Sequence, residues 1–198
     1  MFLSDEEILE LLNLPEYLSF IDTDKLDKKN YMRLFVETAK NHIADYNNVN
    51  LTKKIENVQV KIIDNRNEIN GYSFYYNGHN IICINSGALI KLMEVMLAFV
   101  ENSNFMPSIG TVSKNHLEEK PKSKVINNRI EWSTYIQDST RQDLAFALYY
   151  FACLTLIYHE IGHLIHGHTQ ISKNHIFNYL SICEMACRIR HGVTGKIK

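Results

Sequence analysis

The chain has 198 residues, of which 45% are hydrophobic and 22% charged, and its formal net charge is -1. This length suits one domain with a single core, and the near-zero charge gives no reason to expect nucleic acid or an anionic membrane surface as a partner. The four cysteines are too sparse for a disulfide framework and the acidic start of the chain does not resemble a signal peptide, so we expect a cytoplasmic protein.

Two helices are predicted near the start of the chain. Ser4 and Glu7 have the spacing of a helix capping box, and Pro15 marks the end of the helix that they begin. Apolar residues then recur at helical spacing over residues 27–46. This periodicity predicts the second helix.

The periodicity next changes to that of β-strands. Residues 58–63 alternate, and "YSFYY" and "IICIN" flank Asn77-Gly78, a pair that favours the tight turn of a hairpin. We expect the three strands to form a small antiparallel sheet. Helical periodicity resumes in "INSGALIKLMEVMLAFVENS", with Asn85 or Ser86 as the N-cap.

Residues 103–141 interrupt these patterns. They contain two of the three prolines, many charges and the only tryptophan. A loop of this length inside a compact domain is usually functional or mobile. Two interpretations stay open, a solvated insertion and a flap beside an active site. In both cases we expect a mobile insertion within one domain that spans residues 1–198.

The strongest signal is "HEIGHLIHGH", His159 to His168, which holds four of the nine histidines. It follows an uncharged segment, residues 144–158, that is too short to cross a bilayer and is followed at once by ionisable side chains. We therefore predict a helix over residues 143–166 that is apolar on nearly every side and buried in the core.

The spacing within this motif indicates a metal site. His159 and His163 are four residues apart, so both rings project from one helix face and can reach one zinc ion at roughly 2.0–2.1 Å. Glu160 is offset by about 100°, which places its carboxylate beside the metal. There it can take a proton from zinc-bound water, whose pKa falls to about 7. The alternative is a pair of core histidines that neighbouring groups satisfy.

A third ligand does not follow from the motif alone. His166 lies seven residues after His159, on the same face, so it is either a third ligand or a supporting donor. His168 lies beyond Gly167, a residue that suits a helix C-terminus. We expect His166 and His168 to support or cap the site.

A carboxylate further along the chain is the other candidate ligand. Glu184 follows His163 by 21 residues, with no other acidic residue between the two, on an apolar-periodic segment consistent with an antiparallel return helix. An ordinary surface glutamate is the alternative reading of Glu184. Cys183 and Cys187 are also four apart, but a cysteine pair by itself makes an incomplete metal site.

With these residues together, "HEIGHLIHGH" at the end of an apolar helix is similar to the glutamate-liganded zinc peptidases, or gluzincins. The order of the predicted elements most resembles the phage-exclusion (Lit-type) peptidases of bacteria. The resemblance covers roughly residues 72–190, and only the zinc motif is specific in residues. It implies an α+β, mainly helical zincin-like domain that binds Zn²⁺ through His159, His163 and Glu184, with Glu160 as the general base. It also implies cleavage of an intracellular protein as an antiviral response.

The chain departs from this family at one position. Such families usually carry an aspartate four residues after the glutamate ligand, and here that position is Arg188. Two functions therefore stay open: a zinc endopeptidase with a protein substrate, and a zinc-stabilised binding or regulatory module that has lost turnover. Glu160 favours the enzyme, because a structural zinc site has no use for a free carboxylate beside the metal.

Overall fold

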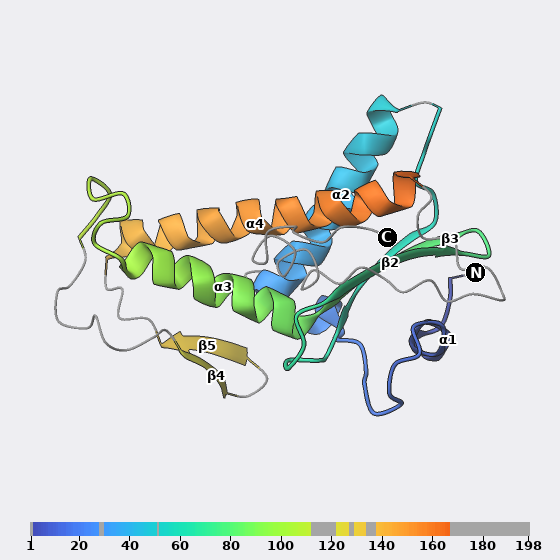
Figure 1. Ribbon diagram of the computed structural model, residues 1–198, viewed down its shortest axis with the longest axis horizontal. Coiled ribbons are helices and arrows are strands. Elements are labelled where there is room, and N and C mark those ends of the chain that lie inside the picture. The colour runs from blue at the N-terminus through green and yellow to red at the C-terminus, as the bar shows by residue number, and fades with distance from the viewer. Residues whose placement is uncertain are drawn as a thin grey trace, which may run out of the picture. The chain divides into compact units, whose positions relative to one another are not determined.

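In the computed structural model of the protein, the described residues are 2–27, 30–50, 52–111, 122–126, 129–133 and 138–166. The helices are α1 (Asp5–Leu11), α2 (Tyr31–Val49), α3 (Ser86–Glu101) and α4 (Ser139–His166), with a short 3-10 helix η1 (Thr23–Lys25). The strands are β1 (Val58–Ile63), β2 (Gly71–Tyr76), β3 (His79–Asn85), β4 (Lys122–Ile126) and β5 (Arg129–Ser133) (Figure 1). Helices and small sheets together confirm the α+β class.

The chain divides into two compact units, residues 1–88 with 156–198, and residues 89–155. Helices α3 and α4 both run through the division. The first unit contains the three-stranded sheet and the end of α4, and the second contains most of both helices. A single domain over residues 1–198 stays a prediction.

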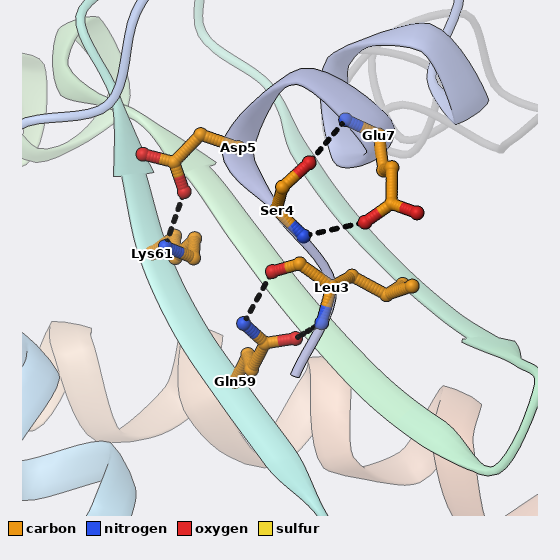
Figure 2. A network of polar contacts seen from close by, with 6 residues as sticks. All are labelled: Leu3, Ser4, Asp5, Glu7, Gln59 and Lys61. Carbon is orange, nitrogen blue, oxygen red and sulfur yellow. Dashed lines mark hydrogen bonds and ion pairs between the residues drawn. The ribbon is translucent and has the colours of Figure 1, made fainter. Parts of the chain in front are cut away.

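The N-terminal helices follow the predicted caps. The Ser4 hydroxyl accepts a hydrogen bond from the Glu7 amide, and the Glu7 carboxylate accepts one from the Ser4 amide, so the capping box is confirmed (Figure 2). Helix α2 begins at Tyr31, four residues later than the predicted start at residue 27, because the Asn30 side chain accepts from the Met32 amide and caps the helix there.

The three-stranded sheet has the order β1-β3-β2. The β2–β3 hairpin is confirmed, with positive φ angles of 48° at Asn77 and 85° at Gly78 in its turn. The prediction of a fully antiparallel sheet is wrong, because β1 pairs with β3 in the parallel sense. Strand β3 is buried on both faces from residue 81 to 85, which favours the central place, and residues 64–70 carry the chain past that place to the far edge.

The two faces of this sheet are covered by different elements. One face packs against α1 in an apolar cluster: Ile8, Leu12, Leu18, Ile63, Tyr72, Phe74, Ile81 and Cys83. On the other face Val60, Ile82 and Ser73 lie in one row across the three strands, and all three are buried. Helix α2 contacts β1. Ser73 is thus a hydroxyl in an otherwise apolar row.

Helix α4 confirms the predicted long helix but not its predicted burial. Its buried residues below the motif follow one stripe at a spacing of four: Ala145, Tyr149, Cys153, Ile157 and Ile161. Phe146, Phe151 and Tyr158 lie off this stripe and are 53%, 64% and 51% exposed. The expectation of burial on nearly every side is therefore wrong, because the helix is packed along one stripe only. By length and composition α4 would also qualify as a membrane span, as core helices of other proteins do.

In the second unit, α3 and the first half of α4 lie side by side (Figure 1). The Arg141 guanidinium donates to the Val100 carbonyl at 2.8 Å, to the Phe105 carbonyl at 3.0 Å and to the Met106 carbonyl at 3.1 Å. These bonds join the start of α4 to the end of α3 and the turn after it.

The segment predicted as a mobile insertion, residues 103–141, is not a loop throughout. It includes the antiparallel pair β4–β5 and the start of α4. Residues 112–121, 127–128 and 134–137 lie outside the described part of the chain. The predicted mobility of this segment and its place beside the active site stay predictions.

Candidate metal centre

The two histidines of the predicted metal site converge at the end of α4. The Nε2 atoms of His159 and His163 lie 3.0 Å apart, and the ring centroids are 4.5 Å apart with the ring planes at 87°. The spacing of four residues places both rings on one helix face, as the sequence predicts. A hydrogen bond between the two nitrogens requires one ring to donate and the other to accept.

This pair of nitrogens fits the geometry of zinc. Two imidazole nitrogens that bind one ion at about 2.0–2.1 Å with a tetrahedral angle lie about 3.3 Å apart. A small rotation of either ring from the observed separation of 3.0 Å provides that spacing. Both rings are half-buried, so the position between them is accessible from solvent.

The third ligand stays a prediction. No third His, Cys, Asp or Glu of the described residues joins His159 and His163 in a group that could hold a metal. His166, the exposed last residue of α4, is described and does not form such a group. Glu184 lies outside the described residues, and so does the Cys183–Cys187 pair.

Glu160 is buried and directed at the sheet. Its side chain is 3% exposed, and its carboxylate lies beside the Ser73 hydroxyl of β2. Burial raises the pKa of Glu160, whereas the Ser73 hydroxyl and the neighbouring His159 ring lower it. The Ser73 hydroxyl falls outside strict hydrogen-bond geometry, since its oxygen has no partner that meets those limits. Glu160 is therefore a carboxylate with weak compensation, held next to the two histidines in sequence.

Two residues beside the site were missed by the sequence analysis. Ser73 is 2% exposed, and its signal was available, because it is the only non-aromatic residue in "YSFYY" and alternation places it on one face with buried neighbours. His42 of α2 is the other, and its Nδ1 atom lies 2.8 Å from the Tyr158 hydroxyl.

The contact between Tyr158 and His42 fixes α4 to α2 one residue before His159. The ring centroids are 5.4 Å apart and the rings meet edge to face. The two residues are 116 positions apart in the chain, so no local pattern indicates the contact. His159 thus has a buried carboxylate on one side and a tethered, half-exposed tyrosine on the other.

Comparison of the chain with family models, with curated proteins and with solved structures gave no match. The resemblance to the gluzincins and to the Lit-type peptidases accordingly stays a prediction that rests on the motif.

Proposed function

We propose that this protein is a zinc-dependent endopeptidase in which His159, His163 and Glu184 hold Zn²⁺ and Glu160 is the general base. The observation that carries the proposal is the convergence of the two histidine Nε2 atoms, 3.0 Å apart on one face of α4. A carboxylate in the next position of the same helix supports a catalytic site over a structural one, because structural zinc sites fill their ligand positions and need no base.

The chemistry follows from the residues around the pair. When bound, zinc would acidify a water molecule to a pKa of about 7 and polarise the scissile carbonyl. Glu160 takes the proton from the attacking water and returns it to the leaving amine. Burial raises the pKa of Glu160, which suits a group that must both accept and donate a proton near neutral pH.

The proposal extends to a zincin-like arrangement around α4, a cytoplasmic location and an intracellular protein substrate cleaved in antiphage defence. These parts rest on the resemblance of the motif alone. They are separable from the metal chemistry, because a zinc peptidase with another biological role would use the same residues.

Elemental analysis of the purified protein tests the metal site. We expect about one zinc per chain, with His163→Ala and Glu184→Ala each removing it. The matched control is His79→Ala, which removes a histidine of β3 outside the site. If Glu184→Ala keeps full zinc occupancy and His166→Ala loses it, then His166 is the third ligand.

Glu160→Gln tests catalysis, because glutamine keeps the shape of the side chain but accepts no proton at neutral pH. We expect cleavage to fall by about 10²- to 10⁴-fold with zinc content unchanged. The matched control is Glu10→Gln, an exposed position on α1. Cleavage is followed as the loss of intact host proteins on expression in cells and on unfolded protein substrates in vitro.

The opposite result is equally informative. If wild type and Glu160→Gln behave alike in cells and neither cuts unfolded proteins, the peptidase proposal fails. With zinc still bound, a zinc-stabilised binding or regulatory module would take its place, and Arg188 would be the first residue to examine.

A further inference from the structure

Strand β1 lies at one edge of the sheet, and half of its outer side is already paired. The Ile62 carbonyl accepts a hydrogen bond from the Ile21 amide at 2.8 Å, and the Asp64 amide donates to the Ser19 carbonyl at 2.8 Å. These bonds form an isolated antiparallel bridge between the segment at residues 19–21 and the end of β1.

The other half of this outer side has main-chain groups directed away from the sheet. In a strand, the N–H and C=O groups of alternate residues point to the same side. Ile62 points outward, so Val60 and Val58 do as well. The inward position of Asn57 agrees, because its carbonyl accepts from Asn80 at the end of β3.

The segment nearest to these groups does not use them. Leu3 is bound through both of its main-chain groups to the Gln59 side chain, at 3.1 Å each, and Asp5 forms an ion pair with Lys61 (Figure 2). The N-terminal segment is thus held by side chains of β1, not by its backbone. Among the described residues, the outward groups of Val58 and Val60 have no hydrogen-bond partner that belongs to the main chain.

A cleft of about 400 Å³ opens at this half of the edge. After Ile21 the chain turns away into η1, which leaves the space beside Val58 and Val60 unfilled. Phe20 lies across from Ile63 in the bridge, so it is on the same face of the sheet as Lys61. The charged residues that line the cleft are Asp5, Asp22, Asp24, Lys40 and Lys61.

We propose that this cleft binds an extended segment of another protein, which adds to β1 as an antiparallel strand in line with residues 19–21. An edge with free N–H and C=O groups is satisfied by alternating acceptors and donors at strand spacing, and a second extended chain supplies both. Phe2 and Phe20 favour an apolar side chain on one face of that segment. Three aspartates against two lysines in the lining favour a basic side chain in it.

This binding site is independent of the proposed zinc centre. Glu160 lies beside Ser73 on β2, which is the opposite edge strand of the same sheet. A protein segment at β1 therefore occupies a different edge from the one beside the catalytic carboxylate. Loss of zinc or of Glu160 leaves the β1 cleft unchanged, so its failure and that of the peptidase proposal are separately visible.

The test begins with a library of random linear peptides displayed on phage and selected on the full chain. A recovered sequence is resynthesised as a free peptide, and its affinity is measured by fluorescence anisotropy. Single N-methyl groups along that peptide should abolish and spare binding alternately, because only every second amide faces β1. The amide protons of Val58 and Val60 should exchange more slowly with solvent when the peptide is bound.

A proline variant tests the position on the protein. Val58→Pro removes an outward N–H without removing a bond to β3, at the first residue of an edge strand, where proline is tolerated. We expect it to weaken binding by about tenfold. The matched control is Tyr75→Pro on β2, whose N–H points to the opposite edge, and it should leave the affinity unchanged.

Several results would overturn the inference. They are equal tolerance of N-methylation at every position, equal weakening by both proline variants, and failure to recover any peptide that distinguishes wild type from Val58→Pro. A dimer of the chain that Val58→Pro dissociates would assign the edge to a second copy instead. The N-methyl series keeps the test decisive if Val58→Pro does not fold.

Discussion

The two ends of α4 each bury a charged side chain, and they satisfy it in different ways. Arg141, near the start, is 1% exposed and donates to three main-chain carbonyls at 2.8 to 3.1 Å. Glu160, near the end, is 3% exposed and has beside it the Ser73 hydroxyl, which does not reach strict hydrogen-bond geometry. The first charge has firm partners and the second has weak ones.

The difference separates a structural charge from one available for chemistry. A buried cation bonded to fixed carbonyls costs much to remove, because the carbonyls are then left without donors. A buried carboxylate with weak compensation destabilises the fold, and such groups are found where function requires them. The comparison therefore predicts opposite effects on stability when each charge is removed.

The largest effect is expected at Arg141. Arg141→Leu keeps apolar packing but leaves the Val100, Phe105 and Met106 carbonyls without their donor, so the free energy of unfolding should fall by roughly 3 kcal/mol. Urea unfolding followed by circular dichroism measures the change. Lys25→Ala is the control, because it removes an exposed ion pair with Asp22 and should leave the midpoint unchanged. A loss at Arg141 no larger than in this control would contradict its structural role.

Removing the charge of Glu160 should act in the other direction. In metal-free protein, Glu160→Gln should raise the free energy of unfolding by about 1 kcal/mol at neutral pH, because a neutral amide costs less to bury than a carboxylate. The raised pKa of Glu160 has the matching sign, since folding disfavours its charged form. A destabilised Glu160→Gln would show that Ser73 and His159 compensate the carboxylate fully.

The two ends also differ in how far the sequence predicts them. The histidine pair depends on a spacing of four residues within one helix, which a local pattern contains, and its convergence is confirmed. Arg141 was not singled out, because its partners lie 35 to 41 residues earlier in the chain and no periodicity records them. Glu184 stays a prediction.

The same distinction holds for the fold. The capping box at Ser4 and the turn at Asn77-Gly78 are local, and both are confirmed. The parallel pairing of β1 with β3 depends on which strand takes the centre of the sheet, and alternation along each strand does not record that choice. The one-sided burial of α4 was missed for a similar reason, since an apolar composition does not show which stripe meets a partner.

A smaller effect is expected at Asp138, which accepts hydrogen bonds from Thr111 and from the Arg141 amide. Bonds from the Thr111 amide and hydroxyl, then from the Arg141 amide, lower the pKa of Asp138 from 3.8 to about 2. Because the folded-state pKa is the lower one, this stabilisation is present above pH 3.8 and is lost as the pH falls toward about 2.

Asp138→Asn should therefore make the unfolding midpoint fall less steeply over that acidic range than it does in wild type. Urea titrations at a series of pH values measure the slope. Asp45→Asn, at an exposed position on α2, is the control and should keep the wild-type slope. Identical slopes in wild type and Asp138→Asn would mean that the bond to Thr111 does not form in solution.

The smallest effect on stability is expected at Tyr158, beside the proposed metal ligands. Tyr158→Phe removes the hydrogen bond to His42, and at a side chain that is 51% exposed this should cost no more than about 0.5 kcal/mol. If the bond only joins α4 to α2, cleavage by this variant should equal that of wild type. If it holds His159 in the orientation that binds zinc, zinc affinity and kcat should fall together while the unfolding midpoint stays nearly constant. His42→Ala removes the same bond from the other partner, so it must give the same result, and a difference between the two variants would assign the Tyr158 hydroxyl a role of its own in the reaction.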